Sequence, residues 1–212
     1  MLAVVDYGMG NLRSVAKALA HVAPGERVVV TSDPAEIRAA ARVVLPGQSA
    51  MPETMAGVLR SGLRDVIVEA LGERPFLGIC LGLQMLFDTS EEGPTECLGV
   101  LPGKVRRFRE AELLTATRER LKIPHMGWNR VRQAVSHPLW TGIPDGTRFY
   151  FAHSYYPAPA DPAATAGTAD YPAPFTCAIA QANIFAVQFH PEKSQRAGLQ
   201  LLANFVTWDG RS

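Results

Sequence analysis

The first half of the chain alternates short apolar runs with segments of helical periodicity. The apolar runs, which predict buried strands, are residues 2–5, 27–31, 42–45 and 76–79. The helical segments are residues 12–20, a segment opened by Asp33-Pro34, a stretch within 52–71 that Gly57 and Gly62 divide, and residues 81–87. Alternation of this kind predicts a parallel sheet that is covered by helices on both faces.

The second half of the chain is richer in strand patterns. β-branched and aromatic side chains gather in residues 99–108, 128–131, 147–155 and 175–189. The run Gln181-Ala182-Asn183 predicts a hairpin turn inside the last of these, and residues 194–208 predict a closing helix. Residues 157–174, rich in Ala, Pro and Asp, are expected to wind over the surface. The whole pattern predicts an α/β fold with a mixed, mostly parallel central sheet.

Composition restricts the classes of function. The 212 residues suit one domain, residues 1–212, with little room for a second. The formal charge of +1 gives no case for nucleic acid or a membrane surface, and no apolar run reaches the roughly 18 residues of a membrane-spanning helix. The chain starts with neither the basic segment nor the cleavage site of a signal peptide. Three scattered cysteines make no disulfide framework or C-x-x-C zinc pattern, so we expect a reducing cytoplasm.

The strongest candidate for chemistry is Cys80. The run Gly78-Ile79-Cys80-Leu81-Gly82 joins an apolar strand to a helix, the layout of a nucleophile elbow with cysteine in the place of serine. Its glycines let backbones approach closely, and the helix N-terminus favours a thiolate, with Leu81 N–H directed at an oxyanion. The alternative is a buried structural cysteine, which is our interpretation of Cys97 and Cys177 because they lack this context.

A thiol nucleophile needs a base, and the base needs an orienting group. The run Phe189-His190-Pro191-Glu192 supplies both at the end of an apolar strand. In an extended chain, residues i and i+2 point to the same side, so His190 and Glu192 are expected to face one site, with Pro191 stiffening the backbone. The alternative is a surface loop with an incidental ion pair.

The remaining histidines are weaker candidates for the base. His21 and His137 are expected at the surface beside turns. His125 and His153 stand in the unusual runs Pro124-His125-Met126-Gly127-Trp128-Asn129 and Phe151-Ala152-His153-Ser154-Tyr155. We interpret these two as structural or supporting residues.

Two glycine-containing turns follow predicted strands. Gly8-Met9-Gly10-Asn11 partly matches a dinucleotide fingerprint, but Arg13 occupies the position of the third glycine. A tight functional loop is therefore the better interpretation than nucleotide binding. Pro46-Gly47-Gln48-Ser49 is a second strand-to-helix turn, which either supplies another backbone N–H to the site or is a plain turn.

With Cys80, His190 and Glu192 placed, the chain resembles the class I, triad-type glutamine amidotransferases. Within that class it is most similar to the glutaminase subunits of imidazole glycerol phosphate synthase, of histidine biosynthesis. The elbow and the H-P-E run belong to the broad class, whereas D-Y-G-M-G-N and P-H-M-G-W-N are specific to these subunits. The matching runs, in order along the chain, are residues 5–15, 78–84, 124–129, 150–156 and 188–194.

The resemblance implies the class I amidotransferase fold and a glutaminase reaction. Cys80 would attack the side-chain amide of glutamine, ammonia would leave, and the glutamyl thioester would hydrolyse to glutamate. The residues that would hold the substrate are Gly47, Leu81, Gln84, Ser154 and Tyr155. No metal or organic cofactor is implied.

The resemblance also implies a heterodimer. The partner would be the (β/α)8-barrel cyclase subunit of imidazole glycerol phosphate synthase, which uses the ammonia on a phosphoribosyl-linked substrate. Its products would be imidazole glycerol phosphate and an aminoimidazole carboxamide ribotide. The residues expected at the contact and in its coupling to the site are Asn11, Met126, Trp128, Tyr150 and Lys193.

Two features depart from the family pattern. Ser49 stands where the family commonly has the second glycine of P-G-x-G, so a positive φ at this position would carry strain. Residues 109–120 make a charged, helix-prone stretch that is longer than usual in the family and has no assigned function.

Three rival functions share parts of this pattern. A glutaminase that feeds a different synthase is disfavoured by the P-H-M-G-W-N run. A binding module that has lost catalysis is disfavoured because Cys80, His190 and Glu192 are all present. A cysteine peptidase on a related fold is the third rival, and a glutaminase assay with and without cyclase separates all of these.

Overall fold

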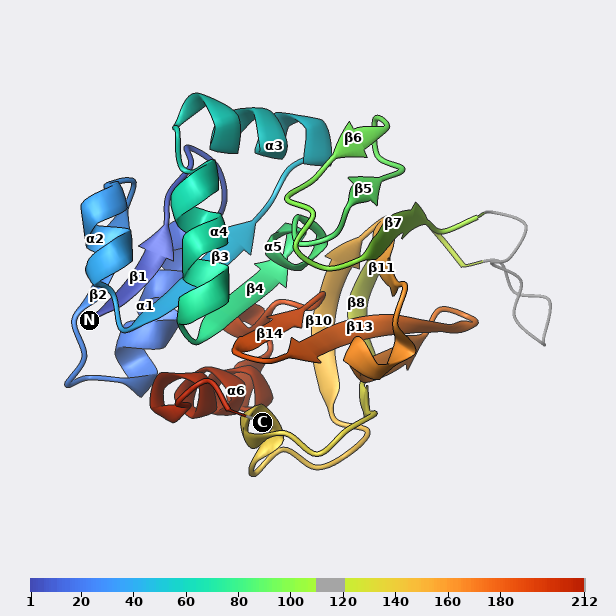
Figure 1. Cartoon of the computed structure of the whole chain (residues 1–212). Helices are drawn as coiled ribbons and strands as arrows, with labels where there is room; N and C mark the ends of the chain where they lie inside the picture. The colour runs from blue at the N-terminus through green and yellow to red at the C-terminus, as the bar shows by residue number, and fades with distance from the viewer. Residues whose placement is uncertain (110–120, 212) are drawn as a thin grey trace.

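An eight-stranded mixed sheet forms the centre of the protein (Figure 1). The computed structural model describes residues 1–109 and 121–211. The parallel strands, in their order across the sheet, are β2 (Val28–Thr31), β1 (Leu2–Val5), β3 (Arg42–Gly47), β4 (Phe76–Cys80) and β14 (Ile184–Val187). The antiparallel continuation is β13 (Pro174–Gln181), β12 (Thr165–Asp170) and β9 (Arg132–Gln133). The predicted mixed, mostly parallel sheet is confirmed.

Helices cover both faces of this sheet. One face carries α1 (Leu12–Val22) and α6 (Gln195–Thr207), and the other carries α2 (Pro34–Ala39), α3 (Met51–Arg60) and α4 (Arg64–Glu73) (Figure 1). Alternate residues of β1 divide between the two cores, since Val4 packs with the α1 and α6 side while Val5 packs with the other helices. Both valines are fully buried, which explains why the strand is continuously apolar.

Two smaller sheets and several short helices adjoin the centre. β8 (His125–Arg130) pairs with β10 (Arg148–His153), and β11 (Tyr155–Pro159), β7 (Gly103–Arg107), β5 (Thr89–Ser90) and β6 (Thr95–Glu96) form a four-stranded sheet. The short helices are α5 (Leu81–Gln84), η2 (Pro138–Trp140), η3 (Pro162–Ala164) and η4 (Pro191–Lys193). Ser154 separates β10 from β11, so the chain changes sheets at a predicted substrate residue.

Several sequence predictions of local structure are wrong. Residues 157–174 do not simply wind over the surface, because β12 lies between β13 and β9 with Ala166 and Ala169 fully buried. Small residues hide a strand from propensity, which tertiary packing overrides. His137 is only 6% exposed, and its ring packs 4.6 Å from Phe185. The helix expected over residues 81–87 ends at Gln84, and the strand expected from residue 99 begins at Gly103.

Part of the chain lies outside this description. Residues 110–120, which make up most of the charged stretch singled out in the sequence, are outside the described residues, as is residue 212. None of the helices within the described ranges has the length and apolar character needed to cross a membrane.

Candidate active site

Cys80 lies on a strained turn at the carboxyl edge of the parallel sheet. It ends β4, between β3 and β14, and has φ 56° and ψ −110°, a conformation rare for any residue other than glycine. Such strain persists where the surrounding structure holds it, and it often marks a functional site. The side chain is almost buried and lines a cavity of about 290 Å³. The backbone therefore presents the sulfur to a small, partly open cavity.

Close backbone packing explains the glycines of the elbow. A Cβ added at Gly82 would collide with the carbonyl oxygen of Leu45, a backbone atom of β3. A Cβ added at Gly47 would lie 2.5 Å from Leu81 Cβ and 2.8 Å from Gly82 N. The turn after β3 and the turn after Cys80 are thus in direct contact. Because α5 is a single helical turn, it supplies amide groups near the sulfur and only a small helix dipole.

His190 and Glu192 are joined by a buried hydrogen bond. His190 Nδ1 lies 2.9 Å from Glu192 Oε1, and the two side chains are 5% and 1% exposed. They follow β14, the strand beside β4, so the imidazole reaches the same cavity as Cys80. The expected extended geometry is wrong, because residues 191–193 form the 3-10 turn η4 with Pro191 at its first position. The contact still forms because the turn folds the carboxylate back towards the ring.

The electrostatics of the site favour the protonated form of His190. Burial by itself lowers the pKa of His190, but the hydrogen bond and charge of Cys80, followed by those of Glu192, outweigh it and raise this pKa to about 10. Since Nδ1 donates to Glu192, Nε2 is the nitrogen available to the sulfur. The arrangement can therefore hold a nucleophile and return a proton to a leaving group.

The cavity beside Cys80 is lined by both apolar and polar side chains. Its lining includes Gln48, Ser49, Leu81, Gln84, Ser154 and Tyr155. Gln84 Nε2 donates to the carbonyl oxygen of Tyr155 at 3.0 Å, whereas Gln84 Oε1 is buried and has no partner among the described residues. Ser49 has φ 89°, so the strain foreseen for a non-glycine residue at this turn is present. Gly47 is buried and does not itself line this cavity, but it packs closely against Leu81, which does.

Comparison with known proteins identifies the family. The family described as Glutamine amidotransferase class-I matches residues 3–208. The chain belongs to this family. The predicted fold and the resemblance to class I glutamine amidotransferases are thereby confirmed.

Relatives of this amidotransferase extend over almost its full length. Imidazole glycerol phosphate synthase subunit HisH of Aromatoleum aromaticum is 62% identical over 207 residues, which cover 98% of each chain. The protein of the same name from Nitrosomonas europaea is 58% identical, again over 98% of each chain. A solved glutamine amidotransferase has a TM-score of 0.72 at 16% identity, covering 97% of this chain and 99% of that one. The glutaminase domain of Trypanosoma brucei CTPS with bound acivicin has a TM-score of 0.65 at 16% identity, covering 98% and 94%. Identities this low show the fold alone.

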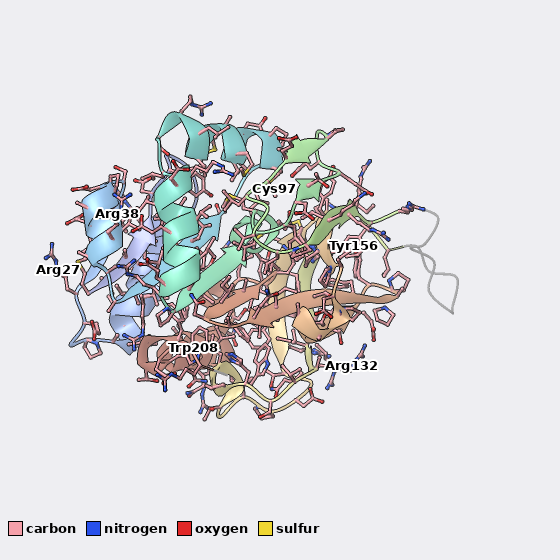
Figure 2. The ribbon with its side chains drawn as sticks, viewed as in Figure 1. Arg27, Arg38, Cys97, Arg132, Tyr156 and Trp208 are labelled. Atoms are coloured by element: carbon pink, nitrogen blue, oxygen red, sulfur yellow. The ribbon has the colours of Figure 1, made fainter. Side chains whose placement is uncertain are left out.

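The other two cysteines of the amidotransferase lack the properties of a nucleophile. Cys97, labelled in Figure 2, lies after β6, and burial followed by the charge of Asp88 raises its pKa to about 12. Cys177, fully buried in β13, has its pKa raised by burial. A raised pKa keeps a thiol protonated and unreactive, which agrees with a structural role for both.

The residues expected at a partner contact lie in two groups. Met126 and Trp128, both on β8, are 63% and 44% exposed, and Trp128 packs against Tyr150 of β10 with ring centroids 6.1 Å apart. Met126 and Lys193 also line the cavity of Cys80. Asn11 occupies the N-cap position of α1 without a side-chain capping hydrogen bond. Its Oδ1 accepts from Ser14 Oγ at 2.8 Å, and it is not among the residues that line this cavity. An exposed aromatic and methionine beside a site are typical of an interface.

A chain of neutral histidines connects β8 with the cavity. His153 Nδ1 lies 2.8 Å from the carbonyl oxygen of Tyr155, which can only accept, so this nitrogen carries the proton. His125 Nδ1 then donates to His153 Nε2 at 2.9 Å. Burial lowers the pKa of His125 to about 4, and burial followed by the charge of His125 lowers that of His153 to about 3. Both rings therefore hold the strands together as neutral groups.

Sequence reasoning missed one residue in contact with the sulfur. Gln188 is fully buried after β14, and its Nε2 lies 3.7 Å from Cys80 Sγ. A signal was present, because a glutamine between apolar residues of a predicted buried strand must find hydrogen-bond partners inside the protein.

Proposed function

We propose that this amidotransferase hydrolyses glutamine with Cys80 as nucleophile, His190 as proton acceptor and donor, and Glu192 as the group that orients His190. The observation that carries this proposal is the strained Cys80 elbow opening into one cavity with an imidazole that is held by a buried carboxylate. Nucleophile, base and orienting group are the arrangement that acyl transfer requires.

The first half of the reaction forms a thioester. The Cys80 thiolate attacks the amide carbon of glutamine, and the developing oxyanion meets the amide groups of the turns at Gly47 and Leu81, which are in contact. His190 Nε2 then gives its proton to the amide nitrogen, and the C–N bond breaks. Ammonia and the γ-glutamyl thioester of Cys80 result.

The second half releases glutamate. Neutral His190 takes a proton from water while the water oxygen attacks the thioester carbon. The C–S bond breaks, the sulfur leaves as a thiolate, and His190 is again protonated beside it. Glutamine and water have become glutamate and ammonia. Gln84, Ser154 and Tyr155, which line the cavity, are the polar groups available to hold the substrate in both steps.

The ammonia serves a partner enzyme. Relatives that share 58% and 62% of the sequence over 98% of the chain carry the name imidazole glycerol phosphate synthase subunit HisH. The chain accordingly works in histidine biosynthesis, and it delivers ammonia to the cyclase subunit of that synthase. Asn11, Met126, Trp128, Tyr150 and Lys193 are the residues proposed for the contact with the cyclase and its coupling.

We also propose a domain organisation and a cellular location for this chain. Residues 1–212 form a single glutamine amidotransferase domain, which the family match over residues 3–208 supports. A cytoplasmic location is supported by a biosynthetic role and by the free thiols of Cys80, Cys97 and Cys177.

The proposed nucleophile is tested by substitution and labelling. Cys80→Ala should abolish glutamate production with cyclase present and leave the melting temperature within a few degrees, because the thiol fills little core volume. A glutamine-analogue affinity label, with the modified residue located by mass spectrometry, should react at Cys80 alone. Cys177→Ala is the matched control, a buried cysteine whose loss should lower stability and spare activity. Labelling at Cys97 or Cys177 instead would refute the assignment of Cys80 as the nucleophile.

A further inference from the structure

Gln188 approaches the reacting sulfur from the strand that also carries His190. It follows β14, its side chain is fully buried, and its Nε2 lies 3.7 Å from Cys80 Sγ. The distance lies within the range of an N–H to sulfur hydrogen bond. A buried amide held against a sulfur is costly unless its own polar atoms are satisfied, so its other contacts decide its role.

A backbone carbonyl fixes which end of Gln188 faces Cys80. The carbonyl oxygen of Tyr155 can only accept, so the Gln84 side-chain nitrogen must face it, at 3.0 Å. The second hydrogen of that nitrogen is directed at Gln188 Oε1, 2.9 Å away. With its oxygen engaged, Gln188 presents its amide nitrogen to the sulfur. The orientation of both amides follows because a carbonyl oxygen can only accept, so it does not depend on how the side-chain oxygen and nitrogen atoms are assigned.

We propose that Gln188 is a catalytic residue that donates a hydrogen bond from Nε2 to the Cys80 thiolate. The inference rests on the proposed function, in which Cys80 is the nucleophile. A hydrogen bond to an ionised acceptor is stronger than one to a neutral acceptor, so it favours the thiolate over the thiol and the thioester. Gln188 therefore helps to ionise the nucleophile, and it stabilises the same sulfur as the leaving group when the thioester breaks.

The chain of amides also connects the sulfur with the substrate cavity. Gln84 Oε1 is buried, lacks a partner among the described residues, and belongs to a residue that lines the cavity. A substrate N–H bound at this oxygen would polarise the Gln84 amide and, through it, the Gln188 amide.

Other titratable side chains from neighbouring elements also face the sulfur or line its cavity. They are Tyr7, Glu92, His153, His190 and Lys193.

The test measures ionisation of Cys80 in the full chain, with and without cyclase. The rate of Cys80 alkylation by iodoacetamide is followed against pH, with the site identified by mass spectrometry. Gln188→Met keeps the volume and removes the donor, and it should raise the pH midpoint by about one unit and slow alkylation about tenfold below that midpoint. Gln188→Glu, which adds an anion, should raise the midpoint further. The control is Gln133→Met, which removes a side-chain amide that donates to the carbonyl oxygen of Ile143, remote from Cys80. It should leave the midpoint unchanged.

The outcomes separate this inference from the proposed function. If Cys80 of the unaltered protein reacts no faster than Cys97 and Cys177, the nucleophile assignment and the inference both fail. If Cys80 reacts fastest but the midpoint in folded Gln188→Met equals that of the unaltered protein, only the role of Gln188 is overturned. Should both Gln188 variants unfold, the side-chain amide proton of Gln188 is followed by NMR in the unaltered protein. Its shift should titrate with the Cys80 midpoint, and an invariant shift overturns the proposal.

Discussion

At the level of single residues, the chemistry depends on how firmly Glu192 holds His190. One carboxylate oxygen, Oε1, accepts from His190, while Oε2 is buried and without a partner in the described part of the chain. A buried carboxylate is costly unless a positive charge compensates it, so Glu192 and protonated His190 stabilise each other. In the proposed mechanism the carboxylate orients the ring, and Glu192 is not among the residues that line the Cys80 cavity.

Substitution should distinguish the orienting role of Glu192 from the proton-carrying role of His190. Glu192→Gln keeps an oxygen that can accept from Nδ1, so we expect the rate of glutamine hydrolysis to fall about 10²-fold. His190→Ala removes the proton carrier, and the rate should fall about 10⁴-fold or more. Steady-state glutamate production with cyclase measures both. Equal and complete loss in the two variants would count against an orienting role for Glu192.

The raised pKa of His190 gives a second prediction at this scale. A group whose pKa is higher in the folded state stabilises the protein fully below its unfolded value and loses that contribution as pH rises through the folded value. For His190 this window runs from 6.5 to about 10, so its contribution to the free energy of unfolding declines over that range. Cys80→Ala removes the largest cause that raises the pKa, and NMR should then find His190 titrating at lower pH. An unchanged titration would contradict the interaction of Cys80 with His190.

At the level of elements, the turn η4 is held between β10 and α6. Ser194 Oγ donates to the carbonyl oxygen of His190 at 2.6 Å and accepts from the Tyr150 amide at 2.9 Å. Gly198 lets α6 approach so closely that an added Cβ would collide with the carbonyl oxygen of Pro191. The position of the His190 and Glu192 turn therefore depends on a helix that contributes no residue to the lining of the Cys80 cavity.

Gly198→Ala should disturb this packing. Because the obstructing atom is backbone, α6 or η4 must move, and we expect the free energy of unfolding to fall by about 1–3 kcal/mol, together with glutaminase activity. The matched control is Gly72→Ala in α4, where a Cβ meets nothing within 4 Å. That exchange should be neutral or stabilise by up to about 1 kcal/mol. Denaturant titration and glutamate assays measure both, and the same result for the two variants would refute the packing argument.

At the level of the whole molecule, the active-site cavity opens beside the surface expected to meet the cyclase. Met126 and Lys193 line the cavity, and Trp128 lies on the same strand as Met126. Ser49, in the turn after β3 and on the lining of the same cavity, has a strained positive φ. A partner contact at Lys193 can therefore act on the catalytic turn, which adjoins it in sequence. A differential contact of this kind is what coupling between two sites requires.

We expect the isolated chain to hydrolyse glutamine slowly and the liganded complex to be faster. Lys193→Ala should reduce turnover stimulated by the cyclase ligand more than it weakens association. Glutamate production at saturating cyclase, with and without the ligand, provides the measurement. Lys17→Ala, an exposed lysine on α1, is the matched control and should leave stimulation unchanged. If the isolated chain is already as fast as the liganded complex, the coupling hypothesis is wrong.

Local and periodic features of this protein could be predicted from its sequence. The parallel strands, α1 and the hairpin at Ala182 follow from apolar periodicity and turn chemistry, which act within a few residues. Cys80, His190 and Glu192 could be proposed as site residues because an elbow and an H-P-E run are short motifs with a chemical reason. The family resemblance added the cyclase partner, which no local pattern in the chain specifies.

Only the tertiary structure decided the contacts between distant segments. Gln188 contacts Cys80, 108 positions away in the sequence, because β14 pairs with β4. The orientation of the Gln188 amide is fixed by the hydrogen bond from Gln84, whose own amide is oriented by the carbonyl oxygen of Tyr155. The burial of His137 and of β12 likewise depends on which surfaces pack together. Propensity and spacing act along the chain, whereas burial, pKa and hydrogen-bond direction depend on neighbours in space, and the fold alone supplies those neighbours.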